Sequence, residues 1–345
     1  MPRSRSVRAV IILVATSVLA MTPATASAAP INGGGITASG LVFNPNPVVT
    51  SGNLALTDQK DADYAALNDE RVRVLLTNLD GSGSLCGAWA CVVNSTKSGA
   101  FETDGTYDYT RHDERFEQVM AYYWVTQSQL YLQSLGFGGG GPFRGINEDS
   151  QAVRIDQWGV DNSFASDAPK DQMVFGKGGV DDAEDAEVIL HEYGHQIHFS
   201  QSATFFGSTE AGAISEGFGD YWAATVSAAI AGAQPDPECI AEWDSISYTA
   251  GPVHCLRRLD ANLSYPDDLN GRVHHDGTIW SQALWQIRGS LGNVKADTAI
   301  LMAQFDWTGT TMIDLANRTV AAAQALYGNG AAMKVRQAFE DRGIL

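Results

Sequence analysis

The sequence predicts an α+β fold with a β-rich N-terminal part and a mainly helical C-terminal part. Alternating apolar residues over 36–50 and 71–76 predict strands in the first part. Apolar residues recur at helical spacing over 113–135 and again near the C-terminus, which predicts helices there. The 345 residues, 44% of them hydrophobic, are enough for one large domain or for two lobes around one cleft.

Residues 1–28 are predicted to be a secretory signal peptide. Arg3, Arg5 and Arg8 precede an apolar run from Ala9 to Ala20, and Ala26-Ser27-Ala28 fits a small-residue cleavage site. The alternative is a short membrane anchor, but a spanning helix needs about 20 apolar residues and this run is shorter. We therefore expect a secreted protein that has no membrane association after the signal is removed.

The composition is acidic. The formal net charge is −18, and loss of the three arginines with the signal would make it −21. This balance disfavours nucleic acid and anionic membranes as partners, because both repel a negatively charged surface. It favours solubility and gives only a weak preference for cationic substrates. We expect the protein to be a monomer.

The four cysteines are expected to pair, because an exported chain meets an oxidising medium. Cys86 and Cys91 lie close together across a glycine-containing turn, and Cys239 and Cys255 bracket a loop with prolines and a glycine. These two local pairs are favoured over the two crossed connectivities, which stay open. A cysteine-ligated zinc ion is the competing interpretation, and the lack of a C-x-x-C spacing counts against it.

The N-terminal elements end at turn signals. The strand predicted over 36–50 runs into the turn Asn44-Pro45-Asn46-Pro47. Glycines from 136 to 141 end the long helix, and short strands are predicted over 151–156 and 172–175. One face of the long helix is apolar: Phe116, Val119, Met120, Tyr123 and Leu130.

The C-terminal elements are predicted to be mainly helical. A glycine-rich loop at 176–179 leads into the acidic stretch 181–187. Acidic side chains complement the dipole at a helix N-terminus, so a helix is expected to begin there. Near the end of the chain one stripe is apolar at helical spacing: Ile313, Ala316, Val320, Ala323 and Tyr327.

The run His191-Glu192-Tyr193-Gly194-His195 has the spacing of a zinc-binding helix. Residues four apart lie on one helix face, so both imidazoles can bind one Zn²⁺ ion, and Glu192 can act as general base on a water. The alternative is a surface helix with two solvated histidines. Gly194 argues against it, because glycine in a helix costs about 1 kcal/mol relative to alanine and needs a packing or functional reason.

A catalytic zinc ion needs a third protein ligand and one open position. Glu216, from a following helix, is the candidate, and Asp220 one turn beyond it is placed to orient a ligating histidine. A longer motif with its third histidine at position 201 fails, because Gln201 stands there. His198 on the same helix is interpreted as packed or solvated. The alternative for Glu216 and Asp220 is an exposed acidic helix face.

A further histidine, His274, occurs in the run 273–280. It could reach across a cleft and stabilise the oxyanion of a tetrahedral intermediate. On its own, the pair His274 and His275 near a turn is more simply read as solvated. The motifs at 191–195 and 215–220 occur in the same chain, which favours a functional role for His274.

Together, the runs at 191–195 and 215–220 resemble the gluzincins, the zinc metallopeptidases of the thermolysin and fungalysin type. The C-terminal runs 325–328 and 335–339 are similar to the end of thermolysin. Val273-His274 followed by Gly277 looks more like the fungalysins. The resemblance is good from residue 150 to the end of the chain and loose over 110–150.

The resemblance implies a two-lobed, thermolysin-like metallopeptidase with the zinc helix between the lobes. Residues 29–182 would form the β-rich N-terminal lobe with one long helix. Residues 183–345 would form the zinc-binding helix and the helical C-terminal lobe. The implied activity is that of a secreted zinc metalloendopeptidase, which hydrolyses a peptide or protein substrate with a zinc-bound water.

The resemblance also implies roles for individual residues. The segments 161–165 and 256–259 resemble the family's substrate-binding edge strand and its arginine-bearing segment. One zinc ion would bind to His191, His195 and Glu216, with Asp220 as the acid that orients a ligand. Glu192 would be the general base and His274 the oxyanion donor. Asn162 and Ser163 would contact the substrate backbone, and Arg257 would contact a substrate carbonyl and Asp220.

Two positions depart from the family pattern. Thermolysin has a transition-state tyrosine between the second histidine and the glutamate ligand, but here Gln196 to Ser215 contains no tyrosine and Phe206 is the nearest aromatic residue. Ser227 stands where a calcium-binding carboxylate is expected, so a calcium requirement stays open.

Val188 and Leu256 match positions that line the family's pocket for the substrate residue on the amine side of the scissile bond. This match implies an apolar preference there. Two rival functions remain: a non-catalytic secreted binding module on the same fold, and a zinc amidohydrolase that acts on a non-peptide amide. Peptide hydrolysis with and without a chelator separates the enzyme from the binding module, and a casein digest separates the two enzymes.

Overall fold

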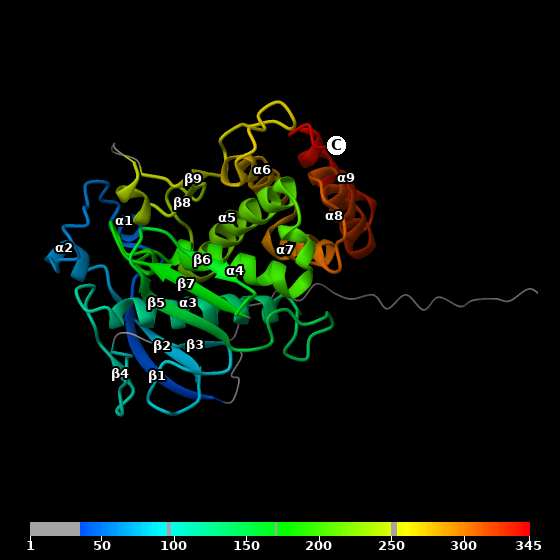
Figure 1. Ribbon diagram of the computed structural model, residues 1–345. Coiled ribbons are helices and arrows are strands. Elements are labelled where there is room, and N and C mark those ends of the chain that lie inside the picture. Colours follow the sequence, from blue (N-terminus) through cyan, green and yellow to red (C-terminus); the bar gives the residue numbers. More distant parts are fainter. Residues whose placement is uncertain (1–34, 95–97, 170, 250–253) are drawn as a thin grey trace, which may run out of the picture. The chain divides into compact units, whose positions relative to one another are not determined.

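The computed structural model describes residues 35–94, 98–169, 171–249 and 254–345, so the expected signal peptide lies outside the described residues. Within them, sheets occupy the first half of the chain and the second half is mainly helical (Figure 1). The predicted α+β fold is therefore confirmed. The division into lobes at residue 182 stays a prediction.

The strands of the first half form two sheets in the described part of the chain. Their bounds are β1 (Ile36–Val42), β2 (Val72–Leu79), β3 (Ala90–Val92), β4 (Thr106–Tyr107), β5 (Gln151–Trp158), β6 (Phe164–Ser166) and β7 (Gln172–Gly176). One sheet has the order β2-β1-β4, with β1 antiparallel to β2 and parallel to β4. The other has the order β3-β5-β7-β6, and β6 is its antiparallel edge strand.

Helices occur between the strands of the first half and account for most of the second half. The bounds are α1 (Pro47–Ser51), α2 (Ala65–Asn68), α3 (Arg115–Ser134), α4 (Ala186–Gln201), α5 (Thr209–Ala231), α6 (Val273–Leu291), α7 (Asn293–Gln304), α8 (Met312–Tyr327) and α9 (Asn329–Glu340), with 3₁₀ helices η1 (Asp182–Glu184), η2 (Ala203–Phe206) and η3 (Asp244–Ser247). The short strands β8 (Cys239–Ile240) and β9 (Arg257–Arg258) pair with each other.

The central helix of the fold is α4. It packs against α3, β6 and β7, and also against α5. Helix α5 in turn packs against α6, which contacts α7 and α9. In Figure 1, α4 and α5 lie between the strands of the first half and the helices at the end of the chain. This arrangement places α4 where the sequence predicts the zinc helix.

Two details of the predicted elements differ from the structure. β1 stops before the Asn-Pro run, and the side chain of Asn46 caps α1 by accepting a 3.0 Å hydrogen bond from the Val49 N–H. Pro47 suits the first helical position, because its missing N–H would have no partner there. In α8, the buried face contains Met312 rather than Ile313, whose side chain is 41% exposed.

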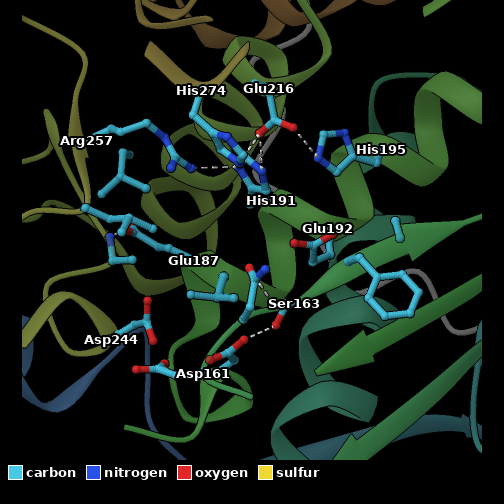
Figure 2. A pocket seen from close by; sticks show the side chains of 18 of the residues that line it. Asp161, Ser163, Glu187, His191, Glu192, His195, Glu216, Asp244, Arg257 and His274 are labelled. Atoms are coloured by element: carbon cyan, nitrogen blue, oxygen red, sulfur yellow. Dashed lines mark hydrogen bonds and ion pairs between the residues drawn. The ribbon is translucent and has the colours of Figure 1, made fainter. Parts of the chain in front are cut away.

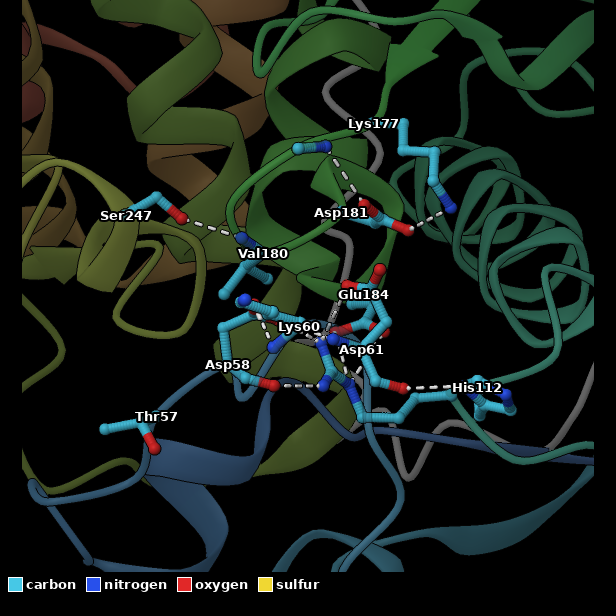
Figure 3. A network of polar contacts seen from close by, with 12 residues as sticks. Thr57, Asp58, Lys60, Asp61, His112, Lys177, Val180, Asp181, Glu184 and Ser247 are labelled. Atoms are coloured by element: carbon cyan, nitrogen blue, oxygen red, sulfur yellow. Dashed lines mark hydrogen bonds and ion pairs between the residues drawn. The ribbon is translucent and has the colours of Figure 1, made fainter.

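A buried arginine joins an N-terminal loop to the start of α4. The guanidinium of Arg111 donates to Glu184 at 2.9 Å and to Asp58 at 2.7 Å. Glu184 also accepts from the indole N–H of Trp243 at 2.9 Å. Figure 3 shows Asp58, Asp61 and Glu184 meeting in this network. Because Glu184 belongs to η1, just before α4, the network fixes where the central helix begins.

Candidate metal centre and active-site cleft

Helix α4 carries the His-Glu-x-x-His run in a buried setting. Its N-cap is Asp185, whose side chain accepts a 3.0 Å hydrogen bond from the Glu187 N–H. His191 and His195 are 7% and 8% exposed, and their ring centroids lie 4.9 Å apart. The helix therefore places both rings on one face, and the solvated-histidine interpretation is wrong.

Glycines let α5 approach α4 closely enough to meet these histidines. A Cβ atom on Gly194 would lie 2.9 Å from Cα of Gly219. A Cβ atom on Gly219 would lie 2.7 Å from Nδ1 of His191. Any side chain at these positions would push the helices apart, so Gly194 has the packing reason that the sequence predicts.

Helix α5 brings Glu216 and Asp220 to the histidines. The carboxylate of Glu216 lies 3.3 Å from Nε2 of His191 and 3.7 Å from Nε2 of His195. Nδ1 of His191 lies 2.9 Å from Asp220, and Nδ1 of His195 lies 2.8 Å from the Ser215 hydroxyl. Because hydrogen bonds hold both Nδ1 atoms on the far side of the rings, both Nε2 atoms face Glu216 (Figure 2).

This donor set fits a zinc ion. One ligand atom from each of His191, His195 and Glu216 lies within 4.8 Å of the other two. Two imidazoles and a carboxylate are ordinary ligands of catalytic zinc, and three protein ligands leave one position open. Hydrogen bonds to the far nitrogens of ligating histidines are the usual way in which such ligands are oriented.

The two histidines have opposite pKa shifts because different groups hold their Nδ1 atoms. Burial disfavours the charged form of each ring. At His191, hydrogen bonds to Asp220 and Glu216 outweigh burial and raise the pKa to about 10. At His195, whose Nδ1 partner is the hydroxyl of Ser215, burial lowers the pKa to about 4. The two histidines outweigh burial at Glu216 and hold its pKa well below its usual range.

Glu192 lies in the same cleft with a free carboxylate oxygen. The residue is 6% exposed, and its Oε2 atom has no hydrogen-bond partner among the described residues. Burial raises the pKa of Glu192 to about 8, although the nearby His191 opposes the shift. A buried, unpartnered carboxylate beside a metal-type donor set is available for proton transfer.

His274 and Arg257 approach the same centre from two further elements. His274 is in the first turn of α6, and its Nε2 atom lies 3.2 Å from Glu216. Arg257, in β9, donates to Asp220 at 2.6 and 2.7 Å. Both line the cleft, which has a volume of about 650 Å³. The structure thus gathers side chains that the sequence places on four separate segments.

Asn162 and Ser163 line the opposite wall, immediately before the edge strand β6. The side chain of Asn162 accepts a 3.0 Å hydrogen bond from the Ser163 N–H, and the Ser163 hydroxyl donates to Asp182. Their position at a sheet edge suits an extended peptide that adds as a further strand.

Several residues in or behind the cleft were not predicted to belong to the site. Ser215 touches both His195 and His198, since its hydroxyl lies 2.9 Å from Nδ1 of His198. His198 is fully buried between the rings of Phe205 and Phe218, so it is packed rather than solvated. Other cleft residues outside the predicted set are Asp161, Asp182, Glu187, Asp244 and Tyr248.

The position of the absent family tyrosine is aromatic but has no hydroxyl. Phe206 lines the cleft, with its ring centroid 6.1 Å from that of His195. Tyr248 also lines the cleft, but its hydroxyl donates to the Asp161 carboxylate at 2.8 Å. Among the described residues, His274 and Arg257 are therefore the candidate oxyanion donors.

Ser227, which stands where a calcium-binding carboxylate is expected, is buried among acidic side chains. Ser227 donates to Glu187 at 2.7 Å, and the amide of Asn46 donates to Glu242 at 3.0 Å. The same amide lies 3.5 Å from Asp185. Calcium needs six to eight oxygen ligands. Hydrogen-bond donors contact several of the carboxylate oxygens around Ser227.

Both predicted disulfides are present. Cys86 pairs with Cys91, and Cys239 pairs with Cys255, so the crossed connectivities and a cysteine-ligated metal are wrong. The second bond closes the loop between β8 and β9. Since Arg257 is in β9, this disulfide helps to hold it beside Asp220.

An α+β fold with a histidine pair on one helix and a glutamate on the next is the arrangement of a gluzincin metallopeptidase. The family model described as Fungalysin metallopeptidase (M36) matches residues 122–299, just over half of the chain. The chain belongs to this fungalysin family. It is therefore a metalloprotease, a hydrolase of peptide or protein substrates, and membership implies a zinc cofactor.

A solved structure has a similar fold. The precursor of protealysin, a metalloproteinase from Serratia proteamaculans, matches with a TM-score of 0.57 and 18% sequence identity. The match covers 74% of this chain and 87% of that chain. At this identity the likeness supports the fold alone. No curated protein matches the chain significantly.

Proposed function

We propose that the protein is a secreted zinc metalloendopeptidase that acts as a monomer. His191, His195 and Glu216 hold one zinc ion, and Asp220 orients His191. The observation that carries the proposal is the convergence of two Nε2 atoms on Glu216, with the unpartnered Glu192 carboxylate in the same cleft. Zinc bound there supplies a Lewis acid that polarises the scissile carbonyl and lowers the pKa of a water.

The side chains of the chain itself carry the other parts of the reaction. Glu192 accepts the proton of the attacking water and passes it to the leaving amine. His274 and Arg257 donate to the negative charge that develops on the carbonyl oxygen. Asn162 and Ser163 hold the substrate backbone beside β6 by strand addition.

Secretion rests on the predicted signal at residues 1–28. Proteases of the fungalysin family are generally secreted, which supports the same conclusion. In the part of the chain that the structure describes, every helix is too short or too polar to cross a bilayer. The secreted fraction of a culture should contain the protein cleaved near Ala28, as N-terminal sequencing would establish.

The test of the activity compares two isosteric variants with the wild-type enzyme. Glu192→Gln should keep its zinc and its fold but lose about 10³-fold or more in turnover, because it removes the proton carrier. Glu216→Gln should lose both zinc and turnover, because it removes an anionic ligand. Turnover is measured on a quenched peptide with and without a chelator, and zinc by elemental analysis.

His274→Ala provides the internal comparison. Loss of one oxyanion donor costs about 10²–10³ in turnover, so this variant should be less impaired than Glu192→Gln and should keep its zinc. Near-normal peptidase activity in Glu192→Gln, or unchanged zinc in Glu216→Gln, would refute the roles proposed here.

A further inference from the structure

Three aspartates gather at the end of the cleft away from the metal centre. Asp161 precedes β6, Asp182 begins η1 and Asp244 begins η3. One carboxylate oxygen of each lies within 4.8 Å of the other two. Figure 2 shows Asp161 and Asp244 at one end of the pocket, His191 and Glu216 at the other. The three carboxyl groups therefore lie inside the cleft and are not spread over a solvated face.

Two of these carboxylates are buried and incompletely partnered. Asp182 and Asp244 are 2% and 3% exposed, and Oδ1 of each has no hydrogen-bond partner among the described residues. Asp182 accepts from the Ser163 hydroxyl through its other oxygen, and Asp161 accepts from Tyr248. Buried polar groups are nearly always hydrogen-bonded, so unpartnered carboxylates that line a cleft indicate a missing donor.

The cluster is also short of positive charge. No ion pair of Asp161, Asp182 or Asp244 occurs among the described residues, and the nearby Arg257 is bound to Asp220. Burial, strengthened by the neighbouring carboxylates, raises the pKa of Asp182 to about 7 and that of Asp244 well above its usual range. A cation placed between the carboxylates would offset both burial and repulsion.

The three aspartates line the same cavity as two apolar residues that the family resemblance places beside the substrate residue on the amine side of the scissile bond. Val188 and Leu256 line the same cavity. The resemblance to the gluzincins implies that both belong to the pocket for the residue after the scissile bond. Val188 lies one helical turn before Glu192, the side chain that protonates the leaving amine in the proposed reaction. The pocket therefore has apolar walls and an acidic end.

We infer that this pocket binds a basic substrate side chain, lysine or arginine, at the residue on the amine side of the scissile bond. The aliphatic stem packs against Val188 and Leu256, and the charged head reaches Asp182 and Asp244. This inference rests on the proposed peptidase function. It replaces the apolar preference implied by Val188 and Leu256 alone.

A side-chain cation fits the cluster better than a metal ion. Hydroxyl groups of Ser163 and Tyr248 already donate to two of the three carboxylates. Two of the six carboxylate oxygens thus already accept hydrogen bonds, so a calcium ion would need water or carbonyl oxygens to complete its six to eight ligands. The remaining oxygens can accept the several N–H groups of a guanidinium or an ammonium.

The test uses quenched peptides that differ only at the residue after the scissile bond, which is Arg, Lys, Leu or Asp. The wild-type enzyme should cleave the Arg and Lys peptides about tenfold or more faster than the Leu peptide in kcat/KM, since a hydrogen bond to a charged group contributes that much. Asp244→Asn should remove most of this advantage and keep cleavage of the Leu peptide. Asp182→Asn should also reduce the kcat/KM advantage of the Arg and Lys peptides.

The matched control is Asp267→Asn, which removes the same charge from an exposed position outside the cleft. It should change each rate by less than about twofold, as distant surface substitutions do. Preferential cleavage of the Leu peptide by the wild-type enzyme would overturn the inference, and that comparison needs no variant. The inference would also be overturned if Asp244→Asn lowered kcat/KM equally for the basic peptides and for the Leu peptide.

Two further outcomes are distinguishable. If the aspartates hold a metal ion, calcium binding to the wild-type enzyme would disappear in Asp244→Asn, and the substrate inference would be wrong. If no peptide is cleaved, or a chelator has no effect on cleavage, the proposed peptidase function fails first. Chelator-sensitive cleavage without a basic preference refutes this inference only.

Discussion

Ser215 connects His195, a proposed zinc ligand, to the buried His198. If His195 uses Nε2 as a ligand, its Nδ1 atom carries the proton and donates to the Ser215 hydroxyl. The hydroxyl proton is then free to donate to Nδ1 of His198. Burial lowers the pKa of His198 well below its usual value, so this ring is a neutral acceptor. His198 thus helps to fix the tautomer of His195.

The partners of the two histidines predict a ranking of zinc affinity. Asp220→Asn removes a charged partner of His191 and should weaken zinc binding by about 10- to 100-fold. Ser215→Ala removes a neutral partner of His195 and should weaken it less, because hydrogen bonds to charged groups are stronger. Competition with a chromogenic chelator measures both affinities. A larger loss in Ser215→Ala would contradict the ranking.

At the scale of residues, groupings marked by helical spacing or by a family motif could be predicted, and groupings without such a mark could not. His191, Glu192 and His195 lie within one helical run, and Asp220 lies one turn beyond Glu216, so their grouping follows from helix geometry. Asp161, Asp182 and Asp244 come from three segments that meet only in the folded chain. No spacing in the sequence marks them as neighbours.

At the scale of elements, the helices of the site are held at close range by glycine contacts. A Cβ atom on Gly217 in α5 would lie 2.1 Å from the carbonyl oxygen of Gly277 in α6. The reciprocal Cβ on Gly277 would lie 2.7 Å from the carbonyl oxygen of Ala213. Since α6 carries His274, this contact sets the distance between His274 and α5, the helix of Glu216.

Gly217→Ala is therefore expected to destabilise the protein by about 1–3 kcal/mol, the usual cost of overpacking, and to lower turnover by displacing α6. Gly289→Ala is the control, because a Cβ atom there meets nothing within 4 Å. It should be neutral or stabilising by up to about 1 kcal/mol, since alanine favours helix. Urea denaturation measures both changes. Equal stability of the two variants would show that the α5–α6 contact can relax.

The ends of helices were easier to predict than the ends of strands. The helix predicted over 113–135 occurs at 115–134, because its apolar face is continuous and glycines follow it. The strand predicted over 36–50 stops at 42, because Asn46 and Pro47 form a helix start as readily as a turn. Which of the two occurs depends on tertiary contacts, such as the bonds from Asn46 to Asp185 and Glu242.

At the scale of the whole molecule, buried acidic groups link stability to pH. Glu117 in α3 is 1% exposed, and neither carboxylate oxygen has a hydrogen-bond partner among the described residues. Burial raises its pKa well above the ordinary 4.5. As the pH rises through 4.5, the unfolded chain releases this proton and the folded protein keeps it, so the free energy of unfolding falls.

Glu117→Gln should remove this penalty. Near pH 4 the variant should have the same free energy of unfolding as the wild-type protein. As the pH rises, the variant should become more stable than the wild-type protein, by at most about 1.4 kcal/mol per pH unit. Urea midpoints at pH 4.5 and pH 8 test the expectation, with Glu148→Gln as the matched substitution at an exposed position. A gain that is equal at both pH values would mean that proton release from Glu117 is not the cause.

The acidic end of the cleft is built on different elements from the metal centre. Asp161, Asp182 and Asp244 lie in a loop and at the starts of two 3₁₀ helices, while the proposed zinc ligands lie on α4 and α5. Loops tolerate replacement far better than helices packed through glycine. Substrate choice can therefore diverge, in evolution or by design, without disturbing the catalytic machinery, and relatives with unlike cleavage preferences can share one unchanged reaction centre.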